Sequence, residues 1–191
     1  MLAHHSGGLV NFAKVAGRIG LDDKTARKYL TVFEQLFIVR RVEPWLRNPL
    51  NRLVKTPKFH FLDSGLLAAT LGATTARLAN DHAILGPLLE AFVYAEILKQ
   101  TDWFDETCAL YHFRDKDQDE VDIVIENNDG AIIGVEVKSA ASVRPVDFNG
   151  LRKLANACGK EFRLGMVLYD GDHVVPFGER MFAAPIACLW G

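Results

Sequence analysis

The sequence predicts a mixed α and β fold (α+β or α/β) in two modules: a winged helix-turn-helix over residues 1–72 and, after a linker over 73–82, an αβββαβ arrangement over 83–191. Charge divides the chain near the same place. Residues 1–80 contain 12 Lys and Arg against 5 Asp and Glu, whereas residues 81–191 contain 10 against 19. A basic half suits phosphate contact and an acidic half suits cations. The alternative is that the opposite charges simply attract the two halves to each other.

The N-terminal module is expected to contain two helices, a β wing and a third helix. Apolar residues recur at helical spacing in the helices, Gly20 ends the first one, and acidic residues stand where N-caps are favoured. A short turn between the first two helices gives the helix-turn-helix pattern. The expected elements are a helix over 9–19, a helix that begins after Asp22 or Asp23 and continues to 37, β segments over 38–42 and 58–62, and a helix over 64–71 capped by Asp63.

The first turns of the second helix carry basic and polar side chains. In a DNA-binding helix-turn-helix this half of the second helix enters the major groove, so DNA is the candidate partner. The alternative is a protein-docking module or an ATPase lid, because a fold alone does not fix a function. The candidate nucleic-acid contacts are Lys24, Thr25, Arg27 and Lys28.

The C-terminal module opens with a helix that is apolar almost all round and is therefore expected to be buried. Glu90 lies within it, and a carboxylate on such a helix requires a partner. A metal ion or Lys138 would serve, and the alternative is a hydrogen-bonded structural acid. The expected elements are a helix over 85–100 with Pro87 in its first turn, strands over 109–114, 120–126 and 131–139, a helix over 146–158 and a strand over 162–169.

Two acids and a lysine lie on neighbouring strands near the middle of the chain. A three-residue loop that ends in Gly130, with the glycine in the left-handed conformation, would set Asp122 opposite Glu136. Lys138 then lies two residues further along on the same face. Opposed carboxylates repel each other unless a cation lies between them, so the pattern predicts a divalent metal site. The alternative is a set of solvated charges on an outer face.

The order αβββαβ, with Glu90 on the first helix, Asp122 on the second strand and Glu136-Val137-Lys138 on the third, is the pattern of the PD-(D/E)XK, or restriction-endonuclease-like, fold. It predicts phosphodiester hydrolysis with Mg²⁺ or Mn²⁺ as cofactor. Asp122, Glu136 and the backbone carbonyl of Val137 would hold the metal, Glu90 would complete or orient the shell, and Lys138 would position or deprotonate the attacking water. The competing interpretation is a non-catalytic module in which the same residues form a structural ion network.

A family resemblance extends along almost the whole chain. The residues that carry it are Tyr29-Leu30, Leu36-Phe37-Ile38-Val39, the run from Thr56 to Leu66, Gly86-Pro87-Leu88-Leu89-Glu90, Glu120-Val121-Asp122 and Val135-Glu136-Val137-Lys138. The sequence resembles the domain of unknown function found behind AAA-type ATPase modules in bacteria and archaea. The resemblance implies an ATPase module, in the same or another chain, as a partner. His60 departs from the family, which usually has tyrosine there.

Several classes of protein are not expected from this sequence. The loop Gly-x-x-x-x-Gly-Lys-Ser/Thr is missing, so the chain is expected to have no ATP site and to be a fragment or a stand-alone remnant of an ATPase. No apolar run approaches the roughly 18 residues of a membrane span, and the N-terminus does not resemble a signal peptide. The three cysteines lack metal-ligand spacing. A cytoplasmic protein with no membrane partner is expected.

Overall fold

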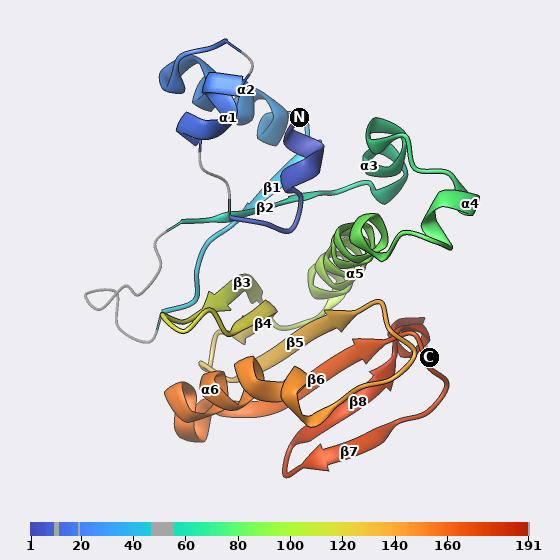
Figure 1. Ribbon diagram of the computed structural model, residues 1–191. Coiled ribbons are helices and arrows are strands. Elements are labelled where there is room, and N and C mark those ends of the chain that lie inside the picture. The colour runs from blue at the N-terminus through green and yellow to red at the C-terminus, as the bar shows by residue number, and fades with distance from the viewer. Residues whose placement is uncertain (10–11, 19, 47–55, 191) are drawn as a thin grey trace. The chain divides into compact units, whose positions relative to one another are not determined.

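The computed structural model describes residues 1–9, 12–18, 20–46 and 56–190, and its mixed α and β character confirms the predicted class (Figure 1). The chain forms two compact units. Unit 1 comprises Met1–Val42 and Thr56–Ala95, and unit 2 comprises Glu43–Lys55 and Glu96–Gly191.

Unit 1 begins with a short 3-10 turn, Leu2–His5, and helix α1, Phe12–Arg18. Leu9, where the predicted helix began, instead forms an antiparallel bridge with Lys58. Residues 10–11 and 19 of the predicted helix lie outside the described residues. Helix α2, Asp23–Gln35, follows with Asp22 as its N-cap, since the Asp22 carboxylate accepts a hydrogen bond from the amide of Thr25.

The rest of unit 1 is a two-stranded antiparallel sheet and short helices. Strands β1, Val39–Val42, and β2, Lys58–Phe61, pair directly. Asp63 caps helix α3, Ser64–Leu71, as predicted, by accepting a hydrogen bond from the amide of Leu66. Helix α4, Thr75–Leu78, lies inside the predicted linker, where Thr74 accepts from the amide of Arg77. Apolar side chains from all these elements form one core, which includes Val15, Leu30, Val39, Phe59, Phe61, Leu67, Leu88 and Ala91.

Helix α5, His82–Trp103, is longer than the predicted helix over 85–100. Asp81 starts it, because its carboxylate accepts from the amide of Ala83 and its carbonyl accepts from the amide of Leu85. Pro87 consequently lies in the second turn rather than the first. The burial of most side chains from Leu88 to Ile97 agrees with the apolar character of the sequence there.

Unit 2 is built on a six-stranded sheet in the order β3-β4-β5-β6-β8-β7 (Figure 1). The first three strands form an antiparallel meander, β6 runs parallel to β5, β8 runs parallel to β6, and β7 is antiparallel to β8. The strands are β3, Cys108–Arg114; β4, Glu120–Asn127; β5, Ile132–Lys138; β6, Phe162–Tyr169; β7, Val175–Gly178; and β8, Met181–Pro185.

Helix α6, Asn149–Cys158, packs against β4, β5 and β6 and is preceded by a 3-10 turn, Pro145–Phe148, where the sequence predicted continuous helix. Glycines allow this close packing. A Cβ atom on Gly150 would lie 1.8 Å from the carbonyl oxygen of Glu120, and one on Gly134 would lie 2.6 Å from the Leu151 side chain. Phe148, Leu151, Leu154 and Phe162 are among the buried residues of this core.

Strands β7 and β8 were not predicted. Pro176 and Gly178 interrupt the alternating pattern of β7, and three of its four residues are exposed, as is typical of an edge strand. The opposite edge of the sheet is extended by the residues that follow β1. The amide of Trp45 donates to the carbonyl of His112 at 2.6 Å, and the amide of His112 donates to the carbonyl of Glu43 at 3.1 Å.

Candidate active site

The β4–β5 hairpin brings Asp122 and Glu136 together. Ile123 pairs with Val135, and the loop Asn128-Asp129-Gly130 closes the hairpin with φ of +76° at Gly130, as predicted. At this register Asp122 and Glu136 occupy the next opposed positions. Both residues are 8% exposed. The Asp122 carboxylate accepts a hydrogen bond of 3.0 Å from the amide of Val137, so the aspartate is anchored to the neighbouring strand.

A β-bulge in β4 adjoins this acid pair. Tyr111 pairs with Val124 and Phe113 pairs with Val121, so β4 has one more residue than β3 over this stretch. The extra residue breaks the strict alternation of side chains between the two faces, and Val121 and Val124 both join the core beneath α6. Bulges of this kind re-aim side chains, and here the bulge includes Asp122 itself.

Lys138 completes a compact group on β5. Its Nζ atom lies 2.8 Å from Oε1 of Glu136, and the lysine side chain is about one-third exposed. Burial of the ammonium group lowers its pKa, but the nearby carboxylates, Glu136 first and then Asp122, have the larger combined effect and raise the pKa above its ordinary value. Lys138 is therefore cationic at neutral pH. This charge state suits it to positioning and charge neutralisation rather than to accepting a proton.

Glu90 belongs to unit 1, where its carboxylate contacts Lys58 and His60. The Lys58 Nζ atom lies 3.3 Å and the His60 Nε2 atom 3.7 Å from Glu90 Oε1, and the Lys58 side chain is only 2% exposed. Gly7, with φ of +75°, lies so close that an added Cβ atom would be 2.6 Å from Glu90 Oε2. The predicted partners of Glu90 were a metal ion or Lys138, with a hydrogen-bonded structural acid as the alternative. The contacts described within unit 1 are with Lys58 and His60, and they agree with that alternative.

Lys58 and His60 are the residues of this region that sequence reasoning missed. They alternate with Phe59 and Phe61 in a strand whose four residues are all buried. The ring of His60 also stacks on Tyr94, with ring centroids 4.5 Å apart. Polar residues at alternate positions of a short strand usually indicate a solvated face. The partly buried Glu90, on a helix distant in sequence, is the signal that indicates otherwise.

The acid pair has the donor chemistry of a magnesium site. Mg²⁺ prefers oxygen ligands and usually binds to one or two carboxylates while it keeps several waters, which Asp122 and Glu136 could satisfy. In the part of the chain that the structure describes, no three His, Cys, Asp or Glu side chains are grouped to hold a metal ion. A bound ion would share the Glu136 carboxylate with Lys138.

The predicted nucleic-acid contacts lie in the first turns of α2. The Thr25 hydroxyl donates to Asp22 at 2.7 Å and therefore belongs to the helix cap. Arg27 pairs with Asp23 at 2.8 Å on the surface. Lys24 and Lys28 are exposed. All four residues lie on one helix as predicted, and their contact with DNA stays a prediction.

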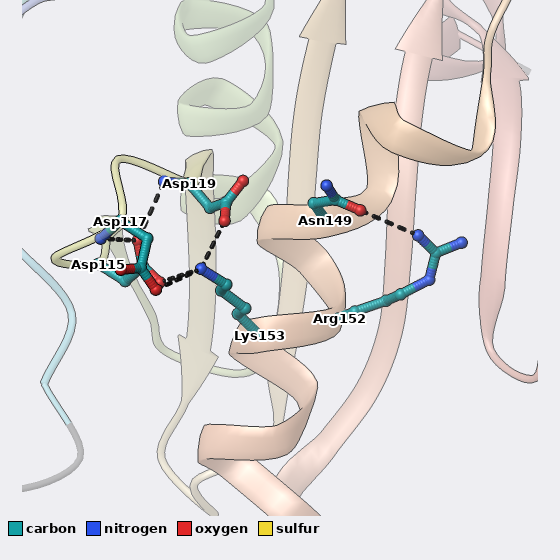
Figure 2. Close-up of polar contacts among 6 residues, drawn as sticks. All are labelled: Asp115, Asp117, Asp119, Asn149, Arg152 and Lys153. Atoms are coloured by element: carbon teal, nitrogen blue, oxygen red, sulfur yellow. Dashed lines mark hydrogen bonds and ion pairs between the residues drawn. The ribbon is translucent and has the colours of Figure 1, made fainter.

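A second polar cluster lies at the turn between β3 and β4. Lys153 of α6 reaches Asp115 at 2.5 Å, Asp117 at 3.0 Å and Asp119 at 2.5 Å (Figure 2). Asp115 also accepts from the amides of Asp117 and Asp119, which shapes the turn. The hydrogen bonds that Lys153 donates to the three aspartates stabilise its ammonium group and raise its pKa. The cluster ties α6 to the turn that leads into β4, and hence to the strand that carries Asp122.

The fold and this geometry define a two-unit α and β protein with a buried carboxylate pair in a mixed sheet. Residues 85–189 match the family described as Domain of unknown function (DUF4143), and residues 1–77 match a second, Domain of unknown function (DUF8612). The chain belongs to the DUF4143 family.

Two mycobacterial proteins are similar along nearly the whole chain. They are Uncharacterized protein Mb2031c of Mycobacterium bovis and Uncharacterized protein Rv2008c of Mycobacterium tuberculosis, each 31% identical over 187 residues. The match covers 97% of this chain and 40% of each relative, so the chain spans well under half the length of these relatives.

Proposed function

We propose that unit 2 is a metal-dependent phosphodiesterase of the PD-(D/E)XK class and that unit 1 is a winged-helix module that binds nucleic acid. The observation that carries the proposal is the group on the β4–β5 hairpin, where two buried acids stand at opposed positions and Lys138 contacts one of them. Burying two carboxylates side by side is costly unless a cation offsets their charge, and a nuclease uses such a pair to hold Mg²⁺.

The order of elements supports the same proposal. From α5 onward the chain runs through β3, β4, β5, α6 and β6, which is the predicted αβββαβ order, and β6 adds to the meander in parallel after the helical crossover. The bulge in β4 falls beside the proposed ligand Asp122. Bulges are over-represented next to active sites because they redirect a side chain without ending the sheet.

The residues of this chain would divide the chemistry as follows. Asp122 and Glu136 would bind the metal, which when bound supplies Lewis acidity and lowers the pKa of its water. The hydrogen bond from the amide of Val137 fixes the Asp122 carboxylate. Lys138, held cationic beside Glu136, would donate hydrogen bonds to the phosphate and stabilise the charge that develops there.

An ATPase partner is the second part of the proposal. The sequence resembles domains found behind AAA-type ATPase modules, and the two relatives are much longer than the matched region. We propose that a nucleotide-binding module, in the same or another chain, works with these two units.

A non-catalytic role in nucleic-acid binding or protein assembly for an ATPase is the alternative. One observation favours it: Asp122 and Glu136 already have partners within the protein, the amide of Val137 and the ammonium of Lys138. Such contacts are also what a structural ion network requires. A regulatory DNA binder, supported only by the basic residues of α2, ranks lowest.

Cleavage of a panel of linear, circular, single-stranded and branched DNAs, with Mg²⁺ or Mn²⁺ and with chelator, tests the proposal. Asp122→Asn is the informative variant, because the amide oxygen can still accept from Val137 while the charge is lost. Asp129→Asn is its matched control, since Asp129 is an exposed acid at the tip of the same hairpin.

Metal-dependent cleavage that is lost in Asp122→Asn and kept in Asp129→Asn would support the nuclease. We expect a loss of at least about a hundredfold, as is typical when an electrostatic contributor to the transition state is removed. No cleavage by the wild type, or equal cleavage by both variants, would refute the role of Asp122 and favour the assembly module.

A further inference from the structure

An apolar stripe lies on the exposed face of α2. Tyr29, Val32 and Leu36 follow one another at spacings of three and four residues, so they lie on one side of the helix, and the exposed Phe37 comes directly after Leu36 in the chain. Leu36 is 61% exposed and Phe37 is 74% exposed. Isolated exposed apolar residues are ordinary, but a contiguous set with a basic border indicates a docking surface. We name these four residues the α2 stripe.

Phe37 occupies a backbone position that disfavours it. The amide of Phe37 donates to the carbonyl of Glu34, and the amide of Ile38 donates to the carbonyl of Phe33. These two bonds form a Schellman motif in which Phe37 is the left-handed residue, with φ of 55°. Glycine is usual at this position because a side chain there costs about 1 kcal/mol. A bulky ring that is strained and also exposed contributes little to folding, which indicates that the ring has another use.

The border of the α2 stripe is basic. Lys28 lies one helical turn before Val32 and Lys24 lies a further turn before it, so the two lysines flank the edge of the stripe on the side of Val32. Both are exposed. The surface that fits the stripe therefore has apolar side chains at its centre and acidic side chains beside them.

Unit 2 carries a surface with those properties at the end of α5. Trp103 is 82% exposed and Phe104 is 70% exposed. Asp102, Asp105 and Glu106 surround these rings in sequence, and all three are exposed. Aromatic rings bury large areas at little cost in conformational entropy, so they are favoured as anchors of interfaces. We name residues 102–106 the acidic aromatic segment.

We propose that copies of this chain associate head to tail, with the α2 stripe of one copy bound to the acidic aromatic segment of the next. The two surfaces match in apolar character and have opposite charge. The charge of the whole chain follows the same direction, since residues 1–80 carry 12 basic against 5 acidic residues and residues 81–191 carry 10 against 19. Each copy presents both surfaces, so the contact is heterologous and closes into a ring or continues as an open chain.

A mixing experiment tests this proposal. One variant, Leu36→Glu, places a negative charge in the α2 stripe, and a second, Trp103→Ser with Phe104→Ser, removes the rings of the acidic aromatic segment. Light scattering after size exclusion should show concentration-dependent association of the wild type. Each variant alone should be monomeric, because its only contacts pair one damaged surface with an intact one. An equimolar mixture should form a two-chain species, in which both intact surfaces meet.

Phe37→Gly separates this role from a structural one. Glycine suits the left-handed position, so the variant should fold at least as stably as the wild type, yet it should weaken association by about tenfold or more because an exposed interface ring is lost. Added salt should also weaken association of the wild type, as expected for opposed surface charges.

Three results would overturn the proposal. A wild type that stays monomeric at all concentrations has no such contact. A Trp103→Ser, Phe104→Ser variant that associates like the wild type would show that the α2 stripe binds something else, such as a second α2 stripe. A mixture that stays monomeric while the wild type associates would exclude the head-to-tail pairing.

Discussion

Gly150→Ala offers the sharpest test of the packing that supports the candidate active site. The added Cβ atom would lie 1.8 Å from the carbonyl oxygen of Glu120 and 2.7 Å from its carbonyl carbon. Comfortable contact needs about 3.5 Å, so α6 must retreat from β4 by on the order of 1–2 Å. Because the obstacle is backbone on one side and helix on the other, no side chain can rotate to make room.

The loss in the free energy of unfolding follows from the side-chain contacts that weaken when α6 moves away from β4. Leu151 and Leu154 of α6 are buried to within 1% of completely. Each contributes about 1.5–3 kcal/mol by burial, and a gap of about 0.5–1 Å forfeits a quarter to a half of the contact attraction. The higher helix propensity of alanine offsets about 1 kcal/mol of this loss, whereas residual strain increases the loss by about 1–3 kcal/mol. We expect a net loss of about 2–4 kcal/mol in the free energy of unfolding.

Urea unfolding followed by circular dichroism measures this loss. Gly17→Ala is the control, because Gly17 lies in α1 and an added Cβ atom there would meet no other atom within 4 Å. That variant should be unchanged or more stable by up to about 1 kcal/mol. If Gly150→Ala unfolds within about 0.5 kcal/mol of the wild type, α6 cannot contact β4 as described.

Two further predictions concern buried polar groups of unit 1. Lys58→Met should destabilise the protein by about 3–5 kcal/mol by leaving the Glu90 carboxylate without its ammonium partner, and adding Glu90→Leu should recover much of the loss in a double-mutant cycle; an additive cycle would contradict the ion pair. Burial raises the pKa of Tyr94 to about 12, with a smaller opposing effect from Arg40. Its contribution to stability is therefore complete below pH 10, the ordinary tyrosine pKa, and is lost as pH rises towards 12. Tyr94→Phe should lack this decline in alkaline unfolding titrations, and an identical decline in both proteins would exclude Tyr94 as its origin.

Features that depend on neighbouring residues could be predicted from the sequence. The loop ending in Gly130 fixed the register that opposes Asp122 to Glu136, because a left-handed glycine in a three-residue loop allows few alternatives. Asp63 was recognisable as a helix cap for a similar reason, and the other cap was narrowed to Asp22 or Asp23, because a cap acts on amides only two or three residues away.

Features that depend on partners distant in sequence could not be predicted. Lys58 and Glu90 are 32 residues apart, and Lys153 and Asp115 are 38 residues apart. Neither pairing leaves a periodic signal in the sequence. In the sequence alone, nothing distinguishes Asp119 or Lys153 from an ordinary solvated charge. Their contact is visible only once α6 is placed against the β3–β4 turn. Strand β7 was missed because Pro176 and Gly178 give this edge strand the composition of a loop.

The contact of residues 43–46 with β3 limits how the two family domains of this protein can recombine during evolution. The chain forms β1 in unit 1, contributes Trp45 to the core of unit 2, and returns to unit 1 to form β2. The ring of Trp45 lies against Phe113, with ring centroids 6.5 Å apart. Recombination that exchanged residues 85–189 alone would separate Trp45 from the partner with which it was selected, and would leave the β3 edge beside an unmatched segment. We therefore expect the two family domains of this chain to evolve together and not to be exchanged separately.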